Sequence, residues 1–154
     1  MDAKDWILLK ALQRDARAAY AELGRLTGLS APAAAERVRR LEDAGIIRGY
    51  HAEVEPAALG LAMPVLIEVQ VKRSDYARFH KTVQGLEPVL ECHHVTGRAA
   101  FVVRAAVGSV EQLEALIGKL SAFGETATSL ILSTPVRRRV FAGGGSASGR
   151  AAMA

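Results

Sequence analysis

The sequence predicts an α+β protein, in which a small helical unit precedes a four-stranded sheet that carries two helices. Apolar residues recur at helical spacing over residues 4–44. From residue 65 onward, runs with the period-two alternation of strands separate two further helical runs. The chain has 154 residues, of which 50% are hydrophobic and 23% charged, so it has enough apolar surface for one ordinary domain or two small ones.

Three short helices account for the N-terminal part of the chain. Their apolar positions are Leu8, Leu9, Leu12, Tyr20, Leu23, Leu26, Ala34, Val38 and Leu41. We predict that Asp5 is an early cap of the first helix and that Ser30 is the N-cap of the third, with Pro32 tolerated in its first turn. Gly45 stands where a glycine would end that helix.

The junction of the second and third helices has the pattern of a helix-turn-helix unit. Gly28 falls where the tight turn needs a permissive backbone, Leu29 then enters the core, and Ser30 begins the next helix. The second helix of such a unit presents its N-terminal residues to the DNA major groove. The predicted contacts are Ser30, Pro32, Ala33 and Glu36 in the groove, with Arg37, Arg39 and Arg40 at phosphates or guanine edges. The arginines alone would suit a solvated helix face, but together with the turn they favour DNA binding.

The second part of the chain has the element order β-α-β-β-α-β. The predicted strands cover residues 65–71, 89–96, 101–107 and 126–134, and the predicted helices cover 75–86 and 109–120. This is the order of ferredoxin-like folds, in which four antiparallel strands carry both helices on one face. Apolar Leu66, Leu90 and Val102 on the other face predict that the sheet packs against a second copy.

The charge is informative through its placement. The net charge is +4, which suggests an acidic partner, but residues 1–62 carry nine basic and nine acidic residues. DNA binding by the first half must therefore depend on local clustering. A short run at 137–139 adds three arginines, either as a solubilising end or as extra phosphate contacts.

The same sequence predicts a soluble protein of the cytoplasm. Acidic residues and Lys10 interrupt the N-terminal apolar run, so it does not have the pattern of a signal peptide. No run of about 20 apolar residues would span a bilayer. The single cysteine, Cys92, allows no intramolecular disulfide and does not indicate an oxidising compartment.

The Cys92-His93-His94 segment invites a metal or catalytic interpretation, which the strand geometry disfavours. Cys92 and His94 share one face of the predicted strand while His93 points to the other. The remaining histidines are His51 and His80, and no HxxxH or CxxC spacing occurs. We therefore expect packing or interface roles, no metal, no cofactor and no enzymatic activity. An enzyme on this scaffold remains an alternative, because fold does not determine function.

Several motifs occur together in one order: ILLKALQRDAR, GLSxxxxxxRVRRLEDAGIIRGY, ECHHVTG and SLILSTPV. Through these motifs, residues 4–140 resemble the Lrp/AsnC family of feast/famine transcriptional regulators. The resemblance implies a DNA-binding domain, a β-strand linker and a ligand-sensing domain. It also implies dimers, commonly assembled into octamers, with small ligands, usually amino acids, bound between dimers. The expected boundaries are 1–50 for the helix-turn-helix (winged-helix-like) domain, 51–63 for the linker, 64–140 for the effector-binding and oligomerisation domain and 141–154 for a flexible tail.

The resemblance also implies an effector site around ECHHVTG. Its residues would be Thr96, Gly97, Arg98, Ala100 and Thr134. Family members typically place an acidic residue directly after this glycine and an aspartate three positions after it, where it meets an amino acid's ammonium group. Here those positions hold Arg98 and Ala100, and loss of the charge-assisted bond costs about 1.5–3 kcal/mol. We expect that ordinary α-amino acids do not bind in the usual pose and that Arg98 meets a carboxylate or another anion. The alternative is that Arg98 is a solvated hairpin residue and the pocket is degenerate.

The function expected from these observations is sequence-specific regulation of transcription. A dimer would place two recognition helices, residues 30–44, on half-sites of double-stranded operator DNA about one helical turn apart or a multiple of that. A small-molecule effector, an amino acid or organic acid, would shift the populations of its assemblies. The alternative is a ligand-binding or assembly module that does not regulate DNA.

Overall fold

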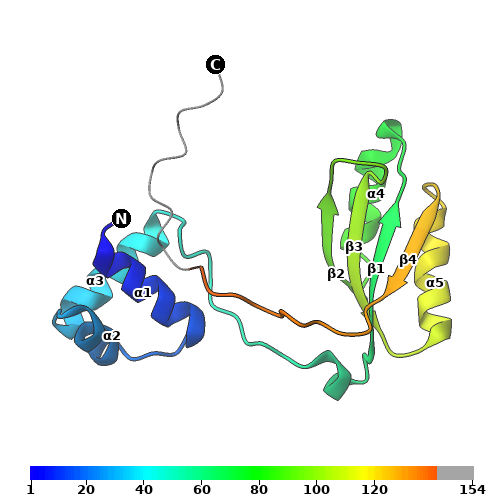
Figure 1. The fold of residues 1–154 in the computed structure, drawn as a ribbon. Coiled ribbons are helices and arrows are strands. Elements are labelled where there is room, and N and C mark those ends of the chain that lie inside the picture. The colour runs from blue at the N-terminus through cyan, green and yellow to red at the C-terminus, as the bar shows by residue number, and fades with distance from the viewer. Residues whose placement is uncertain (142–154) are drawn as a thin grey trace. The chain divides into compact units, whose positions relative to one another are not determined.

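The computed structural model describes residues 1–141, which form two compact units. The helical unit comprises Met1–Glu53 together with residues 136–141, and the sheet unit comprises Val54–Pro135 (Figure 1). The predicted flexible tail, 141–154, lies outside the described residues except for Phe141. No helix among the described residues is long and apolar enough to cross a membrane.

The helical unit contains α1 (Ala3–Arg14), α2 (Tyr20–Thr27) and α3 (Ala31–Asp43). Leu8, Leu23, Ala34 and Val38 form its core, and all four are at most 1% exposed. These residues come from the apolar stripes of all three helices, so packing of those stripes holds the unit together.

The start of α1 differs from the sequence prediction. Asp2, rather than Asp5, is the N-cap, and the prediction for Asp5 was wrong. The backbone N–H of Asp5 donates to Asp2 Oδ1 at 2.9 Å, and that of Asp2 donates to Asp5 Oδ2 at 2.8 Å. Asp5 is thus the third helical residue of a reciprocal capping box, because Ala3 and Lys4 extend the helix toward the N-terminus.

The predicted turn between α2 and α3 is confirmed. Gly28 ends α2 in the left-handed conformation, with φ of 64°. Ser30 caps α3, because its Oγ accepts a hydrogen bond from the backbone N–H of Ala33 at 3.3 Å. Gly45 also has a positive φ, 66°, and directly follows the C-cap of α3. Residues 44–55 contain no strand, so the β-strand linker implied by the resemblance is not formed within the single chain, where it has no partner strand.

The sheet unit has the predicted β-α-β-β-α-β order. Its strands are β1 (Met63–Val69), β2 (Val89–His94), β3 (Phe101–Val107) and β4 (Thr126–Leu130), and its helices are α4 (Tyr76–Gln84) and α5 (Val110–Ser121). Short 3-10 turns cover Pro56–Leu59 and Arg73–Asp75. All strand pairs are antiparallel in the spatial order β2-β3-β1-β4, which makes β2 and β4 the edges (Figure 1).

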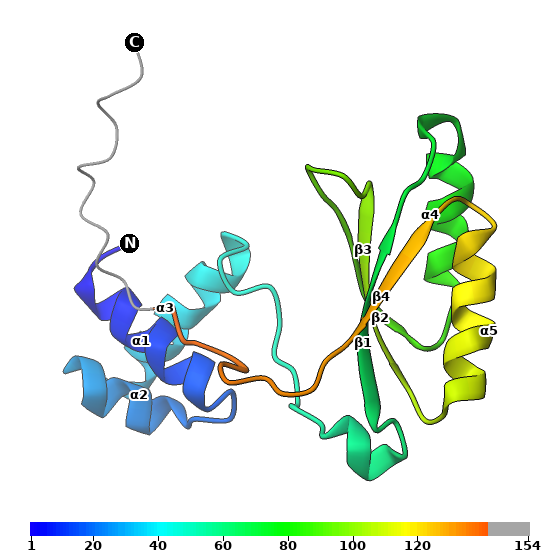
Figure 2. The same cartoon turned by 45° about the vertical axis from the view of Figure 1, so that its right-hand side comes forward.

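Both helices cover the same face of this sheet (Figure 2). Val65, Ile67 and Val69 of β1 point into that covered face and are fully buried, whereas Leu66 and Glu68 point away and are exposed. Val102 is half-buried on the uncovered face, as predicted. The prediction for Leu90 was wrong, because Leu90 lies at an irregularity of β2 and lines cavities that residues of α4 and of α5 also line, on the covered side. The uncovered face is therefore mixed in polarity, since Arg104 and Glu91 also pair there at 2.6 Å.

An aromatic cluster lies on the covered side, at the end of the sheet where β3 begins. The Phe101 ring, which is 1% exposed, lies with its centroid 4.6 Å from Phe79 and 5.0 Å from Tyr76. His94 stacks on Phe101 at 4.9 Å, and His80 meets it edge-on at 5.2 Å. His80 and His94 thus have packing contacts, one of the two kinds of role expected for the histidines.

Candidate nucleic-acid interface and effector site

The N-terminal half of α3 presents small side chains. Ser30 is occupied with capping, Pro32 is exposed, and Ala33 is half-buried. Methyl and ring carbons of this kind make apolar contacts with the thymine methyl group in the major groove. Glu36, about one turn beyond Ala33, is the first exposed charged residue of the helix.

Arg39 and Arg40 extend from the outer face of α3. Their side chains are 67% and 73% exposed, and both pair with Glu36 of the same helix, at 3.2 and 3.4 Å. Exposed pairs of this kind contribute little to stability. A phosphate or a guanine edge can therefore replace Glu36 as the partner of either arginine at small cost.

Arg37 has a different environment from the other two arginines. Its Nη1 contacts Asp2 Oδ2 at 2.7 Å and Asp5 Oδ1 at 2.8 Å, so it joins α3 to the N-terminus of α1. These bonds raise the pKa of Arg37. The backbone N–H of Asp5 and, next, the Arg37 side chain lower the pKa of Asp2. The structure thus gives Arg37 a role in positioning α3, and sequence reasoning missed both carboxylate partners.

We expect Arg37→Ala to lower the resistance of the helical unit to unfolding at neutral pH. Because the folded-state pKa of Asp2 lies below its usual 3.8, the stabilisation is present above pH 3.8 and is lost as the pH falls below it. Urea unfolding followed by Trp6 fluorescence should therefore separate wild type from variant at pH 7 and bring them together at the acidic end. A difference that persists unchanged in acid would contradict this role.

The C-terminal end of α3 is fastened to the segment that follows it. The Tyr50 hydroxyl donates to Glu42 Oε1 at 2.7 Å. Burial and, after it, this hydrogen bond raise the pKa of Tyr50. The backbone N–H groups of Ile46 and Ile47 both bond to the Leu41 carbonyl, at 2.9 and 3.1 Å. The chain therefore leaves the recognition helix in a defined direction.

The predicted effector residues fall at two places in the sheet unit. Thr96, Gly97 and Arg98 lie in the exposed β2–β3 connection, and Ala100 is half-buried at its end. The Ala100 N–H bonds to the Val69 carbonyl, so this connection lies at the C-terminal end of β1.

Thr134 lies beyond the opposite end of β1. The strand β4 runs antiparallel to β1, from Thr126 beside Val69 to Leu130 beside Val65, and Ile131 bonds to the Pro64 carbonyl. Within one chain, the structure does not bring Thr134 to the connection that carries Arg98. A site using both would need residues from two copies.

The region around Cys92 is a cavity of about 440 Å³ between α4 and the edge strand β2. His80 and His94 line it together with Cys92. Burial raises the pKa of the Cys92 thiol, which disfavours the nucleophilic thiolate. In the part of the chain that the structure describes, no three His, Cys, Asp or Glu side chains gather so that they could hold a metal ion.

Comparison with known families decides what this pair of units is. The AsnC-type helix-turn-helix domain matches residues 1–42, and the Lrp/AsnC ligand binding domain matches residues 64–141. The chain belongs to the Lrp/AsnC family of transcriptional regulators. The predicted family, α+β fold and helix-turn-helix unit are thereby confirmed. Its relatives are regulators and not enzymes.

Individual Lrp/AsnC regulators match over most of their length. The HTH-type transcriptional regulator LrpC of Bacillus subtilis is 37% identical over 133 residues, which cover 86% of this chain and 92% of LrpC. The leucine-responsive regulatory protein of Escherichia coli K12 is 32% identical over 139 residues, covering 86% of this chain and 85% of that protein.

Solved structures of Lrp/AsnC proteins share the fold. B. subtilis LrpC has a TM-score of 0.84 at 36% identity, covering 90% of this chain and 99% of that one. A Neisseria meningitidis transcriptional regulator, solved as a complex with L-Met, has a TM-score of 0.85 at 25% identity, covering 92% and 96%.

Proposed function

We propose that this protein is a cytoplasmic, sequence-specific DNA-binding regulator that reads operator DNA with α3 and responds to a small effector. In this proposal residues 1–50 bind DNA, and residues 64–140 bind the effector and assemble the oligomer. Residues 51–63 are the linker between these two domains. The observation that carries it is the left-handed turn at Gly28 followed by a capped α3, from which Arg39 and Arg40 extend, each held only by an exposed intrahelical pair.

The division of roles on α3 follows from its contacts. Pro32 and Ala33 supply apolar contacts to bases, and Glu36 accepts from cytosine when its arginines turn to the DNA. Arg39 and Arg40 supply charge at the backbone or at guanine. Arg37 acts indirectly, by holding α3 against α1.

The double variant Arg39→Ala/Arg40→Ala should bind operator DNA at least tenfold more weakly than wild type at moderate salt. Loss of two phosphate contacts should also reduce the slope of log affinity against log salt by about two. Genome-wide mapping of binding sites supplies the operator fragments, and fluorescence anisotropy over a salt series measures both quantities.

The matched control removes two exposed cations from the sheet unit instead. Lys81→Ala/Lys119→Ala changes the net charge equally and should leave the salt slope unaltered. An equal loss in both double variants would mean that bulk charge, and not α3, carries the binding. No DNA binding by wild type at any mapped site would favour the ligand-binding or assembly module.

We further propose that the effector is an anion held by Arg98, and not an ordinary α-amino acid. Neither residue that replaces the family's acidic positions, Arg98 or Ala100, is able to accept a hydrogen bond from an ammonium group through its side chain. The site would form between two dimers, since Thr134 and the β2–β3 connection lie at opposite ends of β1. A homodimer and, from it, an octamer are the expected assemblies.

Calorimetric titration tests the effector proposal with a panel of amino acids and organic acids. We expect no tight binding of leucine or methionine, binding of at least one organic acid, and a tenfold or greater loss of that binding in Arg98→Ala. Tight leucine binding would refute the proposal, and an organic acid that binds Arg98→Ala equally well would make Arg98 a solvated hairpin residue.

A further inference from the structure

The helical unit contains a cavity that the DNA-reading role does not use. It has a volume of about 800 Å³ and is lined by α1, by residues 46–53 and by the segment 136–141, all of which belong to this one unit. We call it the α1 cavity. Its size is that of a small-molecule site.

The floor of the α1 cavity is apolar and partly aromatic. It includes Trp6, Leu9, Leu12, Ile47 and Tyr50. Trp6 and Tyr50 are 38% and 43% exposed, so large ring surfaces remain uncovered there. Uncovered aromatic surface in a concave site favours an occupant with an apolar body.

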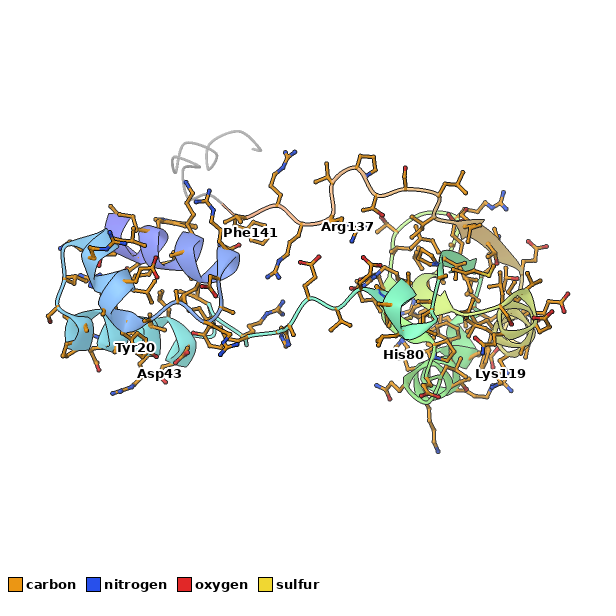
Figure 3. The ribbon with its side chains drawn as sticks, turned by 90° about the horizontal axis from the view of Figure 1, so that it is seen from below. Tyr20, Asp43, His80, Lys119, Arg137 and Phe141 are labelled. Carbon is orange, nitrogen blue, oxygen red and sulfur yellow. The ribbon has the colours of Figure 1, made fainter. Side chains whose placement is uncertain are left out.

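One wall of the α1 cavity comes from the end of the described chain. The Gln13 side chain forms two hydrogen bonds with the backbone of Phe141: Nε2 donates to the carbonyl at 3.3 Å, and Oε1 accepts from the N–H at 3.0 Å. Phe141 and Arg138 of this segment line the cavity (Figure 3 labels Phe141 beside the helical unit). The two-point bond holds the wall in place.

The rim of the α1 cavity is positively charged. Its guanidinium groups come from Arg14, Arg17, Arg48 and Arg138, all exposed. None of these four forms an ion pair with a carboxylate of residues 1–141, in contrast to all three arginines of α3. The acidic lining residues are two, Asp15 and Glu53, so positive charge is in excess.

We propose that the α1 cavity binds a small amphipathic anion, a carboxylate on an aliphatic or aromatic body. The body would cover the floor at Trp6 and Tyr50, and the carboxylate would bond to the unpaired arginines of the rim. A DNA phosphate would satisfy the arginines but leave the apolar floor exposed, and an amino acid would bring its ammonium group against the same cations. The apolar floor and the cationic rim together favour an amphiphile that carries a negative charge and no positive charge.

An occupant of the α1 cavity would also act on the recognition helix. Tyr50 lines the cavity and donates to Glu42 of α3. Residues 46–53, which form another wall, follow α3 after Ala44 and Gly45. Binding that favours one arrangement of this segment must change DNA affinity, and DNA must change ligand affinity by the same factor. The cavity is therefore a second regulatory site, distinct from the sheet unit.

Trp6 is the only tryptophan of the chain, so its fluorescence reports on the α1 cavity. The full-length protein is titrated with decanoate below its micellar concentration, and with decanol and decylammonium as neutral and cationic counterparts. We expect a saturable change with decanoate at least tenfold tighter than with either counterpart. Arg14→Ala/Arg48→Ala should weaken decanoate binding tenfold or more, whereas Arg25→Ala, an exposed arginine of α2 outside the cavity, should leave it unchanged.

Other results would overturn the proposal. Equal binding of decanol would remove the role of the rim, and equal weakening by Arg25→Ala would make the effect one of bulk charge. If Arg98→Ala abolished the change in Trp6 fluorescence, the decanoate site would have to be assigned to the sheet unit. A Trp6 signal that depends on protein concentration and ignores decanoate would show that a second copy covers the cavity. Each result stands apart from the operator measurements, which test the DNA-binding role alone.

Discussion

Replacing Gly124 with alanine is expected to cost the sheet unit roughly 3–5 kcal/mol of unfolding free energy. A Cβ at this position would collide with the backbone carbonyl of Gln70, and the φ of 154° is one that other residues rarely adopt. The backbone cannot move aside easily, because the Gln70 N–H bonds to the Glu125 carbonyl at the start of the β1–β4 ladder. Denaturant unfolding followed by far-ultraviolet circular dichroism measures the loss.

The chain offers a matched control for the Gly124 variant. Gly118 lies in α5, and a methyl group added there would meet nothing within 4 Å, so Gly118→Ala should stabilise the unit by up to about 1 kcal/mol. Trp6 reports only on the helical unit, and its transition should stay unchanged if the damage is confined to the sheet. Equal behaviour of the two alanine variants would refute the close approach at Gln70.

Gly24→Ala should have the second largest effect, on the helical unit. Its Cβ would lie 2.6 Å from the Leu29 carbonyl oxygen, inside the turn that connects α2 with α3. The same turn is held by the Leu29 N–H, which bonds to the Gly24 carbonyl at 2.9 Å. We expect a loss of about 2–4 kcal/mol, with displacement of α3 and, under the proposed function, loss of operator binding. Trp6 fluorescence in denaturant and anisotropy with operator DNA measure the two effects.

Gly28→Asn separates crowding from backbone strain in that turn. Gly28 has a φ of 64° but open space around it, and asparagine tolerates the left-handed conformation. This variant should lose about 1 kcal/mol or less and keep its DNA affinity. If it were as damaging as Gly24→Ala, conformational strain rather than the close approach would dominate the turn.

Local patterns were enough to predict most of the fold. Periodicity predicts that each helix and strand exists, and Gly28 and Ser30 predict the turn, because these signals depend on neighbours within about four residues. The last strand was predicted too long, since β4 ends at Leu130 and not at residue 134. The cap of α1 was misplaced because Asp2 and Asp5 are both good cap residues and their order of use depends on how far the helix extends.

The candidate site was harder to predict, because its decisive contacts join residues that are far apart in sequence. From the sequence RVRR alone, the three arginines are indistinguishable. In the structure Arg37 pairs with carboxylates 32 and 35 residues away, whereas Arg39 and Arg40 pair with Glu36 of their own helix. Thr134 lies away from the β2–β3 connection because of the spatial order of the strands, and hydrophobic periodicity does not determine that order. Whether Arg37, Arg39 and Arg40 touch DNA stays a prediction.

The two hydrogen bonds between Gln13 and Phe141 join residues 128 positions apart, so the ribosome makes the two sides of this contact at nearly opposite ends of synthesis. The sheet unit is inserted, topologically, into the helical one. On the ribosome the three helices emerge first, yet their unit is complete only after every residue of the sheet has been made. The unit that is proposed to read the genome thus leaves the ribosome in two pieces, the helices before any of the sheet and residues 136–141 after all of it.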